Sequence, residues 1–124
     1  MIYITDGETL SKHVPDIINA PRISLDIETA GRPGTREGLD PYAGRIRLIQ
    51  IATQKQTYII DCFRIILPNE YVQTIISKAK KIILMNGAFD LRFLMANSIR
   101  IPNGDKLFDV MLAGILLGSG SDDG

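Results

Sequence analysis

The chain has 124 residues, of which 45% are hydrophobic and 23% are charged, a composition typical of a single globular domain. Its 14 basic and 14 acidic residues cancel, so the overall charge does not attract nucleic acid, which argues against a protein that coats DNA without specificity. The sequence shows no signal-peptide pattern and no apolar run long enough to span a bilayer, so we expect a cytoplasmic protein.

Hydrophobic periodicity and turn residues predict alternating strands and helices along the chain. In chain order we expect a strand at 1–5, a helix at 8–18, a strand at 22–28, a hairpin of strands at 45–53 and 57–61, a helix at 69–79, a strand at 81–85, a helix at 87–98, a strand at 107–108 and a helix at 110–117. Pro15 is expected to kink or end the first helix, and residues 29–44, rich in glycine, are expected to form a long loop. Residues 118–124 are expected to form a flexible tail.

This order of elements implies an α/β fold, because a hairpin followed by strand–helix alternation builds a mixed sheet with flanking helices. A strand, a long loop and a hairpin at the front suit a ribonuclease-H-like arrangement. Ligands of such sheets gather near the carboxyl ends of the central parallel strands, and Asp26 and Glu28 end one strand there. The sequence therefore predicts one domain over residues 1–117 with its site at this edge.

Asp26 and Glu28 lie two residues apart on an apolar strand, alternating with Ile23, Leu25 and Ile27. Because successive side chains of a strand point to opposite faces, both carboxylates are expected on the same side. Two like charges side by side repel unless a cation lies between them, and hard oxygen ligands suit Mg²⁺ and Mn²⁺. The pattern predicts a divalent-cation site, while a solvated strand face is the alternative for this short motif taken by itself.

A second acidic motif, from Asn86 to Leu94, runs from a predicted strand into a predicted helix. Asn86 and Asp90 lie four residues apart, so both are expected to point outward from one helical face. Asp90 is in the first turn, where the helix dipole favours the ionised carboxylate. Phe89, Phe93 and Leu94 are expected to pack the helix and fix that carboxylate, whereas an ordinary first-turn acid is the alternative.

Together, Leu-Asp-Ile-Glu-Thr at 25–29 and Asn-x-x-Phe-Asp-x-x-Phe-Leu at 86–94 resemble the DEDD-type 3′–5′ exonucleases. These include the proofreading domain of family A DNA polymerases and the ribonuclease D group. The resemblance covers residues 22–117, including Ile-Arg-Leu-Ile-Gln-Ile-Ala at 46–52 and Phe-Asp-Val-Met-Leu at 108–112.

The resemblance implies that Asp26, Glu28 and Asp90 hold two Mg²⁺ or Mn²⁺ ions and carry the catalysis. Asp26 would bridge both ions, Glu28 would bind one of them and Asp90 would hold the second. A pair of ions bracketing the scissile phosphate hydrolyses the terminal phosphodiester at the 3′ end of DNA or RNA by the two-metal mechanism.

The resemblance also implies contacts with the substrate. Thr29 and Asn86 match positions that touch the terminal nucleotide. Arg32 and Arg36, in the glycine-rich loop, could bind phosphate, and solvated loop arginines are the equal alternative.

The family carries a fourth acid in a late motif, Tyr-x-x-x-Asp or His-x-x-x-x-Asp, and neither pattern occurs in this chain. The resemblance therefore predicts a domain that is C-terminally truncated before this motif. Asp109 is expected to cap the last helix and not to replace the acid. The apolar segment from Val110 to Leu117 would then be exposed, so we expect it to bind a complementing chain or a second copy.

The leading hypothesis is a metal-dependent 3′–5′ exonuclease domain that needs a complementing segment for full activity. The alternative is a catalytically inactive remnant that binds nucleic acid or a protein. A ribonuclease-H-like endonuclease fits less well, because residues 86–94 match the exonuclease pattern better. His13 is not expected to be catalytic, and Cys62 is expected in the core.

Overall fold

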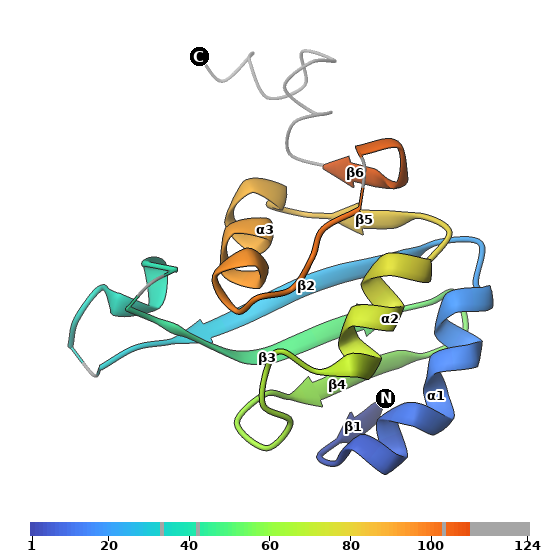
Figure 1. Ribbon diagram of the computed structural model, residues 1–124, viewed down its shortest axis with the longest axis horizontal. Coiled ribbons are helices and arrows are strands. Elements are labelled where there is room, and N and C mark those ends of the chain that lie inside the picture. The colour runs from blue at the N-terminus through green and yellow to red at the C-terminus, as the bar shows by residue number, and fades with distance from the viewer. Residues whose placement is uncertain (33, 42, 103, 110–124) are drawn as a thin grey trace.

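The computed structural model describes residues 1–32, 34–41, 43–102 and 104–109. Its strands are β1 (Ile2–Ile4), β2 (Ile23–Ala30), β3 (Arg45–Ala52), β4 (Thr57–Asp61), β5 (Ile82–Leu84) and β6 (Leu107–Asp109). Its helices are α1 (Gly7–Asn19), α2 (Glu70–Lys78) and α3 (Gly87–Ala96), and short 3₁₀ turns occur at Glu37–Leu39 and Gly104–Lys106. The strands form one mixed sheet in the order β1-β4-β3-β2-β5-β6 (Figure 1).

Strand β2 lies inside the sheet, antiparallel to β3 on one side and parallel to β5 on the other. Strands β3 and β4 form the predicted antiparallel hairpin, in which the Thr53 N–H donates to the Gln56 carbonyl at 2.8 Å. Strand β1 is parallel to β4, and β6 is parallel to β5. The predicted α/β mixed sheet is therefore confirmed, and Asp26 and Glu28 lie on an interior strand.

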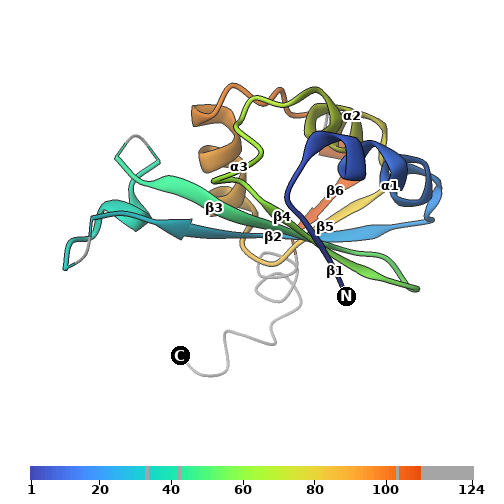
Figure 2. The same ribbon diagram turned by 90° about the horizontal axis from the view of Figure 1, so that it is seen from below.

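All three helices cover the same face of the sheet, as the edge-on view in Figure 2 shows. Ile23, Leu25 and Ile27 of β2 are buried, because alternate residues of the strand point toward these helices. Each helix contributes apolar residues to this core, including Leu10 on α1 and Ile75 on α2, both 0% exposed. Burial of apolar surface, at roughly 25 cal/mol per Å², is the main stabilising contribution.

The opposite face of the sheet carries polar side chains from the same strands. Ser24, Asp26 and Glu28 are exposed on this side of β2, and Tyr3 is 55% exposed on β1. Within the described part of the chain, no helix covers this side (Figure 2). We call it the open face, and a site built on the acids of β2 must lie on it.

The helix predicted at 8–18 is confirmed as α1, and only the early end expected at Pro15 is wrong. Helix α1 continues through Pro15 as far as Asn19, so the proline does not end it. At the other end Asp6 is the N-cap, and its Oδ1 accepts a hydrogen bond from the Thr9 N–H at 2.7 Å. This backbone hydrogen bond lowers the pKa of Asp6. A fixed N-terminus and a buried apolar stripe thus keep the helix intact despite the hydrogen bond that a proline cannot donate.

The last predicted elements are described only in part. The strand predicted at 107–108 is β6, which continues through Asp109. The helix predicted at 110–117, with its proposed partner contact, and the tail at 118–124 lie outside the described residues, so the capping role of Asp109 stays a prediction. Among the residues that the structure describes, no helix has the length and apolar character needed to cross a membrane.

Candidate active site

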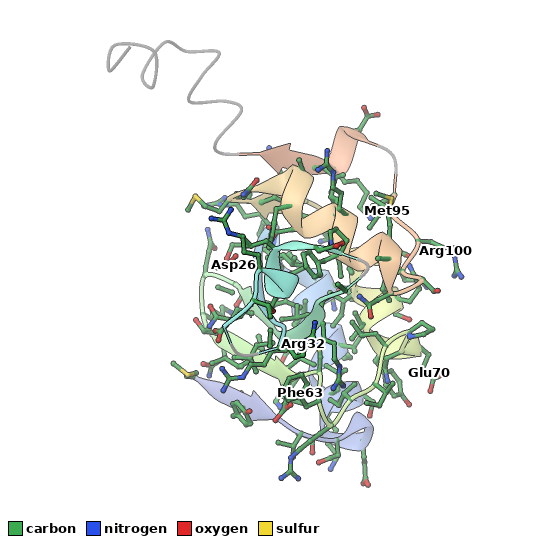
Figure 3. The ribbon with its side chains drawn as sticks, turned by 90° about the vertical axis from the view of Figure 1, so that its left-hand side faces the viewer. Asp26, Arg32, Phe63, Glu70, Met95 and Arg100 are labelled. Atoms are coloured by element: carbon green, nitrogen blue, oxygen red, sulfur yellow. The ribbon has the colours of Figure 1, made fainter. Side chains whose placement is uncertain are left out.

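Asp26 and Glu28 both point to the open face, as the alternation along β2 predicts. Their Cα atoms are about 7 Å apart, since a strand rises about 3.3 Å per residue. The Oδ1 atom of Asp26 accepts a hydrogen bond from the Ile27 N–H at 3.0 Å, and Figure 3 labels this residue. Two carboxylates on one exposed strand face form a pair of hard oxygen donors suited to a divalent cation.

Glu28 forms an ion pair across the sheet. Its Oε1 lies 3.2 Å from Nη1 of Arg47 on β3, which donates a hydrogen bond to it. In the strand register Glu28 lies opposite Leu48 and Thr29 lies opposite Ile46, so Arg47 is the extra residue of a β-bulge. The bulge places the Arg47 guanidinium beside Glu28 on the open face.

Thr29 links the end of β2 to the glycine-rich loop through a hydrogen bond. Its hydroxyl donates a hydrogen bond to the carbonyl of Gly38. A Cβ atom at Gly38 would lie 3.5 Å from the backbone of Ala30, so this part of the loop is in van der Waals contact with the end of β2. Arg32, labelled in Figure 3, and Arg36 are both exposed on this loop. Both guanidinium groups are therefore accessible from solvent.

Asp90 does not point outward with Asn86, contrary to the prediction. Asn86 is the exposed N-cap residue of α3, and its side chain makes no capping hydrogen bond. Asp90 is 1% exposed and lies among the buried residues of the helix with Phe93 and Leu94. Residues three and four positions apart share a helical face. Phe93 and Leu94 are three and four positions after Asp90, so Asp90 lies on the same buried face of α3.

The packing of α3 itself agrees with the prediction. Phe93 and Leu94 are 0% and 1% exposed, and the Phe89 ring lies 4.9 Å from the Phe93 ring, centroid to centroid. These contacts fix the first turn of the helix, and therefore the backbone that carries the Asp90 carboxylate.

The described residues contain no group of three or more histidine, cysteine, aspartate or glutamate side chains that could hold a metal ion. Asp26 and Glu28 fit a divalent cation as a pair, whereas Asp90 lies on the buried side of α3. Carboxylates that approach one another without a cation repel, and Glu28 is paired with Arg47. The arrangement is therefore a two-carboxylate donor pair, and the predicted convergence of three carboxylates is not seen.

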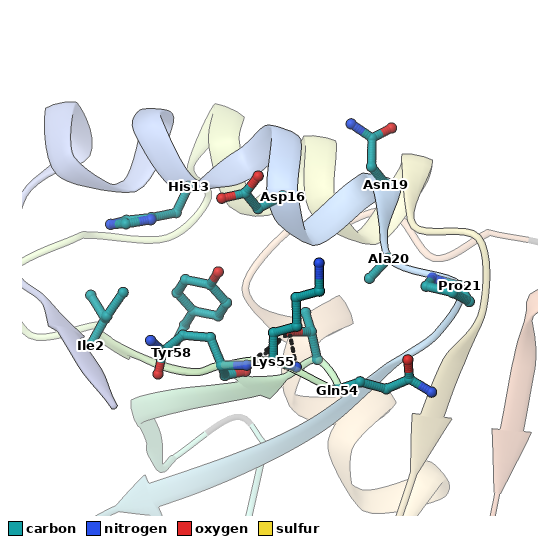
Figure 4. A pocket seen from close by; sticks show the side chains of 11 residues that line it. Ile2, His13, Asp16, Asn19, Ala20, Pro21, Gln54, Lys55 and Tyr58 are labelled. Carbon is teal, nitrogen blue, oxygen red and sulfur yellow. Dashed lines mark hydrogen bonds between the residues drawn. The ribbon is translucent and has the colours of Figure 1, made fainter.

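Two cavities lie at different parts of the sheet. A cavity of about 220 Å³ on the open face is lined in part by Asp26, Gln50 and Met85. A larger one, about 510 Å³, lies between α1 and the β3–β4 turn, and its lining includes His13, Asp16, Lys55 and Tyr58 (Figure 4). Asp26 lines the smaller cavity and does not line the larger one, so the smaller cavity is the one associated with the candidate site.

His13 packs against the hairpin as part of the larger cavity. Its ring centroid lies 5.3 Å from that of Tyr58, which is 4% exposed. Burial raises the pKa of the Tyr58 hydroxyl, and the charge of Asp16 adds to the effect. This contact gives His13 a packing role far from the acids of β2.

Sequence reasoning missed three residues near the site. Arg47 is brought there by the bulge, and the Arg45 guanidinium carbon lies 4.7 Å from the centre of the Phe63 ring, which is 44% exposed. The bulge has a sequence signal, because apolar residues alternate at 46 and 48 and then at 49 and 51, so the alternation shifts by one residue within the strand. The contact of Arg45 with Phe63 has no such signal, since it joins separate segments of the chain.

Comparison with known proteins agrees with this architecture. Residues 1–122 match a protein family described as 3′–5′ exonuclease. DNA polymerase I of Aquifex aeolicus (strain VF5) is 34% identical over 116 residues, a stretch that spans 94% of this chain and 17% of that protein. The chain thus corresponds to a small part of the length of this relative.

Solved structures of similar fold include two from Trypanosoma brucei. The catalytic core of RRP6 superposes with a TM-score of 0.76 at 23% identity, covering 94% of this chain and 30% of the other. RNase D in complex with RNA U12 superposes with a TM-score of 0.68 at 19% identity, covering 87% of this chain and 36% of the other. At these identities the two structures establish the fold and nothing further.

Proposed function

Because the chain belongs to the 3′–5′ exonuclease family, we propose that it removes nucleotides from the 3′ end of DNA or RNA by metal-dependent hydrolysis. The observation that carries this proposal is the pair of carboxylates, Asp26 and Glu28, exposed on one face of an interior strand. A divalent ion bound there would supply a Lewis acid for the phosphoryl oxygen and lower the pKa of its bound water. The protein's contribution is to bind the ion and to position the 3′ end of the nucleic-acid strand.

Asp26 and Glu28 are the proposed first ligands for Mg²⁺ or Mn²⁺, and Asp90 is the proposed third. Both β2 acids are exposed and already share a face. Asp90 is 1% exposed in the first turn of α3, so it is the least accessible of the three proposed ligands. A two-metal site depends on its taking part in binding.

The terminal nucleotide is proposed to contact residues at the end of β2 and the start of α3. Thr29 ends the carboxylate motif, and Asn86 is an exposed N-cap whose side-chain amide makes no capping hydrogen bond. Arg32 and Arg36 on the glycine-rich loop are proposed to bind phosphate, since guanidinium groups pair well with phosphate oxygens.

Both DNA and RNA are proposed as substrates. The sequence relative is a DNA polymerase, whereas one structure of similar fold contains RNA. Side-by-side assays on matched DNA and RNA strands will show which is preferred.

The experiment uses single-stranded DNA and RNA labelled at the 5′ end, incubated with the protein in Mn²⁺, in Mg²⁺ or in EDTA. We expect a ladder of products shortened from the 3′ end with either metal, no products in EDTA and no cleavage of a circular strand. Asp26→Asn, which removes one charge from the exposed donor pair, is expected to lower the rate by at least ~100-fold. Asp16→Asn, the same change on α1, is the matched control and should leave the rate unchanged. Absence of metal-dependent shortening of both strands would contradict the proposal.

A second candidate function is a catalytically inactive scaffold that binds nucleic acid or a protein. It is favoured by the absence, among the described residues, of a group of three possible metal ligands. Calorimetric titration with Mn²⁺ separates the two functions. An exonuclease binds Mn²⁺ in a way that Asp26→Asn weakens, whereas a scaffold of this kind shows no Asp26-dependent binding.

A further inference from the structure

We propose that the open face beyond Glu28 is a binding surface for single-stranded nucleic acid, formed by Arg47, Phe63 and Arg45. We call these three residues the platform. The inference rests on the proposed function, because it extends the substrate path away from the carboxylate pair. It assigns the phosphate contact to Arg47 and the base contact to Phe63, which is backed by Arg45.

Arg47 is placed to bind a phosphate next to the carboxylate pair. It is the bulged residue of β3, and its Nη1 lies 3.2 Å from Oε1 of Glu28. A guanidinium has five N–H donors, so this one hydrogen bond leaves others for a second anion. The Arg47 side chain is 53% exposed, which keeps those donors accessible from the open face. A nucleic-acid strand whose 3′ end is bound at Glu28 would therefore have the Arg47 guanidinium next to its following phosphate.

Phe63 provides an exposed aromatic surface beside Arg45. The residue follows β4, and its ring is 44% exposed, in contrast to Phe93 at 0%. The Arg45 guanidinium lies over the Phe63 ring at 4.7 Å, and no described carboxylate forms an ion pair with Arg45. A ring with a cation on one side can stack a nucleobase on its other side, and aromatic side chains bind bases of any sequence in this way.

The three strands place these groups in succession across the sheet. Glu28 is on β2, Arg47 is on β3 and Phe63 lies in the turn that follows β4. Neighbouring strands are about 4.8 Å apart, so the path from carboxylate to aromatic ring crosses two strand spacings. A bound strand would therefore meet the carboxylates first, then the guanidinium and then the ring.

Asp61, the acid near the platform, is paired, so its charge is partly neutralised and repels a nucleic acid less than an unpaired carboxylate would. The Asp61 carboxylate accepts a hydrogen bond from the Tyr3 hydroxyl at 2.8 Å and lies 3.9 Å from the Arg64 guanidinium. Asp61 and Glu28 are each paired to an arginine, and Arg45 adds a third guanidinium beside Phe63. Guanidinium groups next to an exposed aromatic ring favour a single nucleic-acid strand over a folded acidic protein.

The test measures binding of fluorescent oligothymidine and oligouridine by anisotropy at several salt concentrations, in EDTA so that no hydrolysis occurs. Phe63→Leu keeps an apolar side chain but removes the aromatic face, and it should weaken binding about 10-fold at every salt concentration. Arg47→Gln should weaken binding and reduce the slope of log K against log salt by about 0.7. Arg100→Gln removes an exposed arginine on the helix side, labelled in Figure 3, and should change neither quantity.

The two proposals can fail separately. Wild-type affinity for both Phe63→Leu and Arg47→Gln would overturn the platform, while metal-dependent shortening by the same preparations would leave the exonuclease proposal standing. Weaker binding by both variants of a protein that shortens neither strand would support the platform and contradict the exonuclease. Failure of the wild-type protein to bind either oligonucleotide would overturn the platform. Thermal melting of each variant confirms that it is folded before binding is measured.

Discussion

Glu28→Gln is the substitution that best separates a functional carboxylate from a structural one. The change keeps the size of the side chain and removes its charge, so it ends the ion pair with Arg47 and removes one proposed metal ligand. If the open face is an active site, the activity should fall steeply while the fold is nearly unaffected.

The small effect on stability follows from exposure. The two partners are 51% and 53% exposed, and ion pairs of this kind contribute about 0.2–1 kcal/mol because water screens them. Unfolding entropy near 2.1 cal/mol/K per residue gives about 0.26 kcal/mol/K for 124 residues. A loss of 0.2–1 kcal/mol then lowers Tm by about 1–4 °C.

The expected loss of activity is much larger. Outer-shell changes at metal sites typically cost 10–100-fold, so loss of a direct ligand should lower the rate by at least ~100-fold. The assay is the shortening of a 5′-labelled strand in Mn²⁺, paired with a thermal melt of the same preparation. Glu70→Gln is the matched control for activity, since this acid is exposed in the first turn of α2, and it should keep the wild-type rate. A Glu28→Gln protein with the wild-type rate would refute the assignment of Glu28 as a ligand.

Three further predictions concern the fold around the site. Ile49→Ala, at a position 0% exposed on β3, should lower the free energy of unfolding by about 2–5 kcal/mol in urea denaturation, whereas Ile66→Ala, at 61% exposed, should change it by less than about 0.5 kcal/mol; equal effects would contradict the assigned core. Asn69 caps α2 by accepting hydrogen bonds from the Tyr71 and Val72 N–H groups. Asn69→Ala should therefore lower the free energy of unfolding by about 1 kcal/mol, whereas Asn69→Asp, which can still accept these hydrogen bonds, should keep most of the stability. Burial, aided by the charge of Asp61, raises the pKa of the Cys62 thiol to about 12, so the native protein should resist a thiol reagent near pH 8 and react once unfolded. Because the folded-state pKa is raised above 9.0, the contribution of Cys62 to stability is complete below about pH 9 and is lost as the pH rises toward 12, and Cys62→Ala should flatten this decline; rapid labelling of the native protein would count against burial.

The local pattern of the sequence was sufficient to predict most of the elements near the site. Alternation along residues 23–28 predicted both the buried row and the two carboxylates on the opposite face, because side-chain direction in a strand depends only on position. The hairpin of β3 and β4 and the helices α2 and α3 followed from short-range signals in the same way. Only the early helix end expected at Pro15 was wrong, because the burial of the helix around it outweighed the local preference of the proline.

The burial of Asp90 could not be predicted from the sequence motif at 86–94. Its spacing from Asn86 suggested a shared outward face, but the same helix also carries Phe93 and Leu94, and the sheet decides which face is buried. Rotation of a helix about its axis is set by the competition among all its side chains for the core. Asn86 is the N-cap of α3 and has non-helical backbone angles, so the four-residue spacing rule does not extend to it, whereas Asp90 is inside the helix and is buried with Phe93 and Leu94.

By itself the sequence determined the strands, the helices and the carboxylate pair on β2, since each depends on neighbours in the chain. Only the tertiary structure decided that a bulge brings Arg47 to Glu28 and that Arg45 lies over Phe63. Such contacts join residues that are distant along the chain, and they exist only once strand register has been fixed by the burial of the whole sheet.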